Sequence, residues 1–281
     1  MMDVITGQSA PTLTFDTSAG RRPDAIWQLE DQPEMDTPAL RFLACPANPR
    51  QAEELLAYTH YLGNTLAADL RFFWPSGSTR ATLAALFQEA QLNSDLVILG
   101  EPEQSLLERL VQGTAAFQAV DHASTSLLLV RRPRWPLRKL LLVARGTAAD
   151  ETAVSWVMRL ARPAHASVTV LALLPPVPAL YSPEAHLQQS LALLATPAMS
   201  LGRELAAMAQ HLQASGIPST LHLRQGTPAW QVGCELVEGD YDLIALAAGP
   251  VGWWRRWLHS DVLGPLVRLA NRPLLIVKRE A

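Results

Sequence analysis

Short, mostly apolar runs of strand length alternate along this chain with stretches whose apolar residues recur at helical spacing. In the first half the strand-length runs are Ala39–Cys45, Leu70–Trp74, Asp95–Gly100 and Ser126–Arg131. In the second half they are Lys139–Ala144, Ser167–Leu174, Ser219–Arg224, Asp242–Ala248 and Pro273–Lys278. Strands that are apolar on both sides are buried on both faces, as in a parallel sheet covered by helices. The alternation therefore predicts an α/β fold with doubly wound parallel sheets.

The intervening stretches carry apolar residues three and four positions apart, which is the spacing of an amphipathic helix. The predicted helices are Arg50–Leu66, Thr79–Gln91, Ser105–Gln112, Asp150–Ala161, Leu201–Leu212, Pro228–Glu238 and Asp261–Ala270. Asp150 is a typical N-cap residue, and Pro228 stands in a first helical turn, where proline is tolerated. Near the start of the chain, Thr12–Phe15 predicts one edge strand.

Composition excludes several classes of protein. A length of 281 residues suits about two domains, and 49% hydrophobic residues suffice for packed cores. The formal net charge of -3 argues against nucleic acid as a partner, because nucleic-acid binders carry a basic footprint. Cys45 and Cys234 form no disulfide or metal-binding pattern. Without an apolar run of about 18 residues or a secretory leader, we expect a cytoplasmic protein with no membrane span.

Two motifs recur at one shared distance along the chain. Asp95–Leu99 matches Asp242–Leu246, and Leu127–Arg131 matches Leu274–Lys278, each pair being 147 residues apart. Such motifs can occur in any two α/β domains, but a shared offset favours a true duplication. We therefore interpret the chain as two tandem copies of one domain.

The two predicted copies differ in length. Their first strands, at Arg41–Leu43 and Lys139–Leu141, are only 98 residues apart, so the first copy lacks about 49 residues that the second contains. A deletion of this size removes one outer strand, one helix and their loops, and it leaves the centre of the sheet in place. The expected organisation is an N-terminal arm at 1–37, a shortened domain at 38–132 and a full-length domain at 137–281.

A series of motifs in the second half is typical of one family. In order, they are Lys139–Ala144 followed by Arg145-Gly146-Thr147, then Gly226-Thr227-Pro228, Asp240–Ile244, Gly249–Gly252 and Arg272–Val277. In this order and spacing the second half resembles the universal stress protein family over residues 137–279, whereas the first half resembles it only in outline.

The resemblance implies a five-stranded parallel sheet and a role in stress adaptation or as a regulatory binding module. Some members of that family bind ATP and others do not. Members usually pair through their last strands, so the two copies of a tandem chain are expected to pair with each other in this way. Pairing of two chains into a homodimer is a further possibility.

The family's ATP-binding pattern is Gly-x2-Gly-x9-Gly-Ser/Thr after the fourth strand. Here Gly249 and Gly252 match the opening pair, but the closing pair falls on Ser260 and Asp261 after seven residues. In a nucleotide site, the carboxylate of Asp261 would repel a phosphate. The alternative is that Asp261 is the N-cap of a helix. His259, in the same loop, either donates a hydrogen bond to an anion or has a structural role.

Two more positions belong to the expected site. One departs from the family's residue, and the other is located only approximately. Arg145 stands where the family has an aspartate after the first strand, and with Gly146 it either holds a small anion or is solvated. The apolar contact with adenine is expected near Leu173. ATP or another adenine nucleotide is thus the candidate ligand, although no cofactor is firmly implied.

The first copy also lacks part of the motif. Gly113 and Thr114 restore the closing pair at the offset of 147, but Pro102 and Ser105 replace the opening glycines, and Ala47 replaces the aspartate.

Trp253, Trp254 and Trp257 are interleaved with Arg255 and Arg256. Tryptophan and arginine are favoured at protein interfaces, so we expect a protein partner here first. The alternatives are packing of the indoles on the core and, less favoured by the acidic chain, stacking on nucleic-acid bases.

No HExxH, GxSxG or GxxxxGK[ST] motif occurs, so the sequence supports no catalytic residue and no metal ligand. We expect a non-enzymatic universal stress protein that regulates through a small ligand or partner bound at a degenerate nucleotide site. One alternative is an ATP-binding member with slow ATPase activity, and another is a purely structural interaction module.

Overall fold

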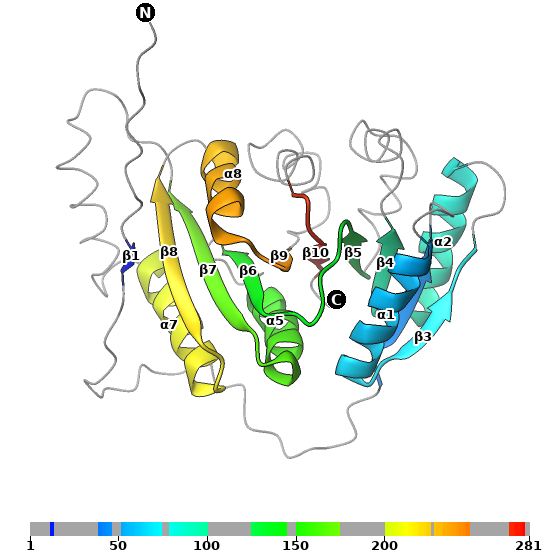
Figure 1. The fold of residues 1–281 in the computed structure, drawn as a ribbon, viewed down its shortest axis with the longest axis horizontal. Coiled ribbons are helices and arrows are strands. Elements are labelled where there is room, and N and C mark those ends of the chain that lie inside the picture. Colours follow the sequence, from blue (N-terminus) through cyan, green and yellow to red (C-terminus); the bar gives the residue numbers. More distant parts are fainter. Residues whose placement is uncertain are drawn as a thin grey trace, which may run out of the picture.

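A computed structural model describes residues 12–13, 39–46, 52–74, 79–100, 125–144, 150–174, 200–225, 228–247 and 270–278. A single ten-stranded sheet runs through the molecule, with the order β1-β8-β7-β6-β9-β10-β5-β4-β2-β3 (Figure 1). Its strands are β1 (Thr12–Leu13), β2 (Arg41–Cys45), β3 (Asp69–Phe72), β4 (Leu96–Gly100), β5 (Ser126–Val130), β6 (Lys139–Ala144), β7 (Ser167–Leu174), β8 (Ser219–Gln225), β9 (Leu243–Ala247) and β10 (Leu274–Val277). The helices of the described part are α1 (Ala52–Leu66), α2 (Thr79–Asn93), α5 (Asp150–Ala164), α7 (Ser200–Ala214) and α8 (Pro228–Gly239).

The sheet consists of two parallel halves. From its last strand outward, the second half has the order β10-β9-β6-β7-β8, and the first half has the order β5-β4-β2-β3. The first half thus has the order of the second without its outermost strand. The fold class is therefore α/β, with two tandem doubly wound parallel sheets, as the sequence predicts.

The two halves meet at their last strands. Strands β5 and β10 are antiparallel neighbours, with Leu128 opposite Leu275 in the centre of the pairing. All other neighbouring strands from β8 to β3 are parallel. Because two sheets of like order join through one antiparallel pair, an approximate twofold axis relates them.

The helices of the described part cover both faces of the sheet. In β6, Leu140 and Leu142 face the core formed with α1, α5 and α7. Leu141 and Val143 face the opposite core, to which α2 and α8 contribute. Both faces of the central strands are therefore buried, which explains why they are apolar at every position.

The local geometry of the two halves repeats at the offset of 98. Helices α1 and α5 each contain 15 residues and begin 98 residues apart, at Ala52 and Asp150. Each is followed at the same place by a left-handed residue, Ala67 with φ of 50° and His165 with φ of 51°. These repeated turns support the interpretation that the chain contains two copies of one domain.

Some predictions lie at the margins of the described part. The expected edge strand is present as β1, which pairs antiparallel with β8, Thr12 lying opposite His222. The rest of the arm at 1–37 and the predicted helix at 105–112 lie outside the described residues, as does 261–270 except for Ala270.

Candidate functional site

The strand order of the second half reverses next to β6, whose neighbours are β7 and β9. In the parallel register of β6 and β9, Val143 lies opposite Leu246, so Ala144 and Ala247 end their strands at one edge. Ligands of doubly wound sheets bind at such a switch point, beyond the carboxyl ends of the strands. The two strands that precede most of the predicted site residues therefore end side by side.

Most residues of the predicted nucleotide site belong to these loops, outside the described residues. They are Arg145, Gly146, Gly249, Gly252, His259, Ser260 and Asp261, and the predicted partner-binding tryptophans Trp253, Trp254 and Trp257 also lie there. Leu173 is described. It is half-buried near the carboxyl end of β7 and packs against the core on the α8 side. Its predicted contact with adenine stays a prediction.

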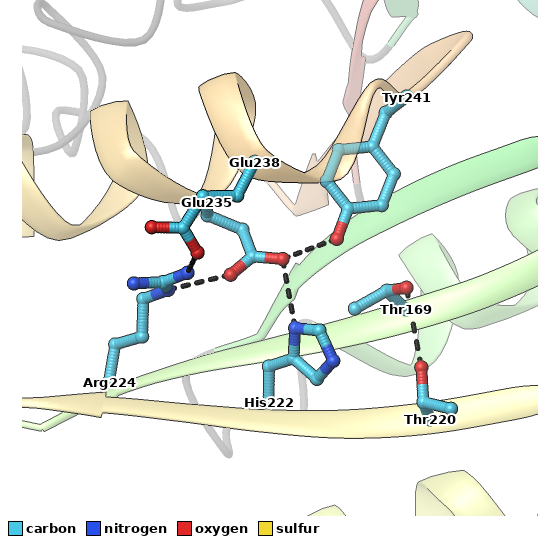
Figure 2. Close-up of polar contacts among 7 residues, drawn as sticks. All are labelled: Thr169, Thr220, His222, Arg224, Glu235, Glu238 and Tyr241. Carbon is cyan, nitrogen blue, oxygen red and sulfur yellow. Dashed lines mark hydrogen bonds and ion pairs between the residues drawn. The ribbon is translucent and has the colours of Figure 1, made fainter. Parts of the chain in front are cut away.

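A polar cluster beneath α8 was not predicted from the sequence. Strand β8 alternates, because Leu221 and Leu223 are buried in the core on the α7 side. His222 and Arg224 point to the opposite face, where α8 presents the carboxylate of Glu235 (Figure 2). Two elements that are separated by a loop thus bring charged groups together inside the sheet–helix layer.

Glu235 is the centre of this cluster. Its side chain is only 1% exposed, and both carboxylate oxygens are hydrogen-bonded. Nδ1 of His222 donates to Oε1 at 2.9 Å, and Nε of Arg224 donates to Oε2 at 2.6 Å. The hydroxyl of Tyr241 also donates to Oε1. An ionised carboxylate accepts only, so each of these three groups must be the donor.

The hydrogen bonds determine the ionisation of Glu235. Burial alone would raise its pKa, but the bonds from His222, Tyr241 and Arg224 outweigh burial and lower the pKa to about 2. Burial and the same carboxylate raise the pKa of Tyr241, which therefore stays a neutral donor. The cluster is thus a permanently charged, satisfied network at neutral pH.

The network extends from Glu235 in two directions. Nη2 of Arg224 donates to Oε2 of Glu238 at 2.5 Å, at the more exposed end of the cluster. On the other side, the Nζ atom of Lys139 lies 5.0 Å from the ring centroid of Tyr241. The cationic groups are therefore held in place around one buried carboxylate.

The sequence contained a signal for this cluster. His222 and Arg224 alternate with buried leucines on one strand, and Glu235 interrupts an apolar stretch of helix. The corresponding positions of the first half, 147 residues earlier, hold the uncharged Gln88 and Gln91 in place of Glu235 and Glu238. Among the described strands of the first half, none is equivalent to β8, so the described part contains one such cluster.

Other chemistry has little support in the described residues. They contain no group of three His, Cys, Asp or Glu side chains that could hold a metal ion. Burial raises the pKa of the Cys45 thiol to about 11, which makes the thiolate scarce at neutral pH. Among the described helices, none is long and apolar enough to cross a membrane.

Comparison with known proteins gives a consistent result. The model of the universal stress protein family matches residues 136–278. A universal stress protein from Archaeoglobus fulgidus DSM 4304 is similar in structure, with a TM-score of 0.53 and 13% identity, covering 82% of this chain and 77% of that one. A functionally unknown protein from Pseudomonas aeruginosa PAO1 has a TM-score of 0.51 and 13% identity, covering 86% and 83%. At this identity the structural likeness shows the fold alone. No match was found among curated proteins.

Proposed function

Because this chain belongs to the universal stress protein family, we propose that it is a non-enzymatic regulatory module of the stress response. The proposed ligand or partner binds in the crevice beyond β6 and β9. The observation that carries the proposal is the register of these strands, which brings Ala144 and Ala247 to one edge at the switch point. A cytoplasmic location agrees with this role.

The residues that follow these strands argue for a weakened nucleotide site. Arg145 replaces an acidic residue of the family pattern, and Ser260-Asp261 replaces its closing Gly-Ser/Thr pair. A carboxylate beside a phosphate adds repulsion between like charges. Gly249 and Gly252 keep the opening pair, which favours ATP binding with slow hydrolysis as the second candidate function.

Equilibrium titration with ATP separates the two functions. We expect no saturation of the wild-type protein at micromolar ATP. Arg145→Asp restores the family residue and should tighten ATP binding roughly tenfold, about the effect of one charge-assisted hydrogen bond. Ala47→Asp is the control, since it places the same aspartate at the corresponding position of the first copy, which lacks the opening glycines. Saturable micromolar binding by the wild-type protein would instead establish the ATP-binding function.

The ligand itself is best identified by mass spectrometry of small molecules that co-purify with the native protein. A purely structural role predicts a different result. In that case Trp253→Ala and Trp257→Ala would change the oligomeric state, and no small molecule would co-purify with the wild-type chain.

A further inference from the structure

A second hollow lies at the opposite edge of the sheet from the proposed crevice. It has a volume of about 510 Å³ and lies where β6, β7 and β8 begin. The polar residues that line it include Lys139, Ser167, Thr169, Ser219, Thr220 and His222. Lys139, Ser167 and Ser219 are the first residues of their strands, whereas the crevice follows the last residues.

The groups that face this hollow favour negative charge. The lining residues include Lys139, Thr169 and Thr220, and no carboxylate is among them. The hydroxyls of the two lining serines, Ser167 and Ser219, already donate to backbone oxygens. Two described carboxylates beside the lining residues are engaged elsewhere. Glu235 is bonded to His222, and Asp242 accepts from the backbone N–H groups of Arg138 and Lys139. An ammonium group and a hydroxyl donor together form a suitable lining for an oxyanion.

Most of these groups are held in place before any ligand arrives. Glu235 fixes His222 through Nδ1, and the second ring nitrogen is turned away from Glu235, on the side of Thr169 and Thr220 (Figure 2). The hydroxyls of those two threonines lie 3.3 Å apart. The Lys139 ammonium lies over the ring of Tyr241, which is itself bonded to Glu235. A prearranged donor set binds an anion without the cost of ordering its side chains.

We propose that this hollow is a binding site for a small oxyanion, a phosphate or carboxylate group. Lys139 supplies the charge, and the hydrogen-bonded pair of Thr169 and Thr220 supplies the one hydroxyl proton that is not used between them. Glu235 is a positioning residue that holds His222 and, through Tyr241, the surface on which Lys139 rests. The site is separate from the nucleotide crevice and belongs to the second half alone.

The first half provides the internal control. Arg41 occupies the position of Lys139, 98 residues earlier, but its guanidinium is paired with Asp95 at 3.2 Å. Because no strand described in the first half is equivalent to β8, the side of the hollow that contains Thr220 and His222 has no counterpart among the described residues there. Removing the charge of Arg41 therefore changes the net charge as much as removing that of Lys139, without touching the proposed site.

Calorimetric titration with inorganic phosphate, at constant ionic strength in chloride buffer, tests the site. We expect saturable binding by the wild-type protein, roughly tenfold weaker binding by Lys139→Gln and Thr220→Val, and a change below about twofold for Arg41→Gln. Parallel titration with succinate distinguishes the two sources of the anion, since the tighter of the two identifies a phosphate or a carboxylate ligand. Absence of saturation with both anions, or equal weakening by Lys139→Gln and Arg41→Gln, would overturn the proposal.

A measurement on the wild-type protein removes any dependence on how well the variants fold. In a ¹H–¹⁵N spectrum, phosphate should shift the backbone amides of residues 167–169 and 219–222. Shifts confined to 143–144 and 246–247 would place the anion in the nucleotide crevice and would refute the second site.

Discussion

At the scale of single residues, Glu235 shows how a buried charge becomes stabilising. A carboxylate removed from water is costly unless donors replace its hydration, and here His222, Arg224 and Tyr241 do so. Removing one partner from such a network leaves the others buried and unsatisfied. A substitution in the cluster should therefore lower the free energy of unfolding far more than a substitution in an exposed ion pair.

We predict that Glu235→Gln lowers the free energy of unfolding by about 3 kcal/mol at pH 7, because a buried ion pair loses its charge. The folded-state pKa of Glu235 is lowered to about 2, so its stabilisation is complete above pH 4.5, the value of a free glutamate, and is lost as the pH falls toward 2. In urea denaturation from pH 7 to pH 3, the gap between wild type and variant should hold above pH 4.5 and narrow below it.

Glu238→Gln is the control for this experiment. Glu238 bonds to the same arginine but is 62% exposed, so its replacement should cost less than about 1 kcal/mol. Equal destabilisation by the two substitutions, or a gap for Glu235→Gln that stays constant with pH, would contradict the role given to the buried carboxylate.

The residues of the site divide according to the kind of signal that reveals them. The glycine pattern around Gly249 is local, so the resemblance could be traced in the sequence, and the site it implies stays a prediction because these residues lie outside the described part. Glu235 became important only through His222 and Arg224 on another element, and such a contact has no local signature apart from charge in an apolar surrounding. The expectation that Leu173 contacts adenine came from the resemblance and stays a prediction, since the structure shows only that Leu173 is half-buried near the end of β7.

At the scale of elements, one aspartate performs the same task in each half. Oδ2 of Asp95 accepts a hydrogen bond of 2.7 Å from the backbone N–H of Arg41, at the start of β2. Oδ2 of Asp242 accepts bonds of 2.8 and 3.0 Å from the N–H groups of Arg138 and Lys139, at the start of β6. The aspartate that recurs in the sequence at the offset of 147 thus anchors the first strand of each half, β2 or β6, to the neighbouring strand, β4 or β9.

We predict that Asp242→Ala destabilises the protein more than Asp95→Ala does, by about 2 against about 1 kcal/mol. Asp242 is 7% exposed and accepts from two backbone groups, whereas the Asp95 side chain is 35% exposed and water can replace it. Urea denaturation of the two variants at pH 7 measures the difference. A larger loss for Asp95→Ala would show that burial does not set the cost of these contacts.

Helices and strands could be predicted where the pattern of residues within the element itself indicates its type. Apolar runs and helical spacing located all strands of the two halves, since both faces of the central strands are buried. The pairing of β5 with β10 could not be read from periodicity. It came from the resemblance, because periodicity carries no information about which strands become neighbours.

At the scale of the whole molecule, the two halves are joined on the sheet and above it. Beyond the pairing of β5 with β10, α1 and α5 pack against each other across the joint. The ring centroids of Phe42 and Trp156 are 6.5 Å apart there, and the hydroxyl of Tyr61 accepts a bond of 2.9 Å from the N–H of Leu137. Each half therefore covers an apolar surface and a strand edge of the other.

This joint leads to a prediction for the second half on its own. A fragment of residues 137–281 exposes the edge of β10 and the face of α5 around Trp156, which β5 and α1 cover in the full chain. An uncovered strand edge beside an apolar face favours pairing with another chain. We expect the fragment to form a dimer through β10, with a mass twice that of one chain in sedimentation equilibrium.

Adding a separately expressed first half, residues 38–132, should convert this dimer into a heterodimer, because β5 and α1 form the native surface for the same edge. A fragment that stays monomeric and folded would show that the second half does not need the covering surface, and the joint would then be a consequence of the covalent link alone.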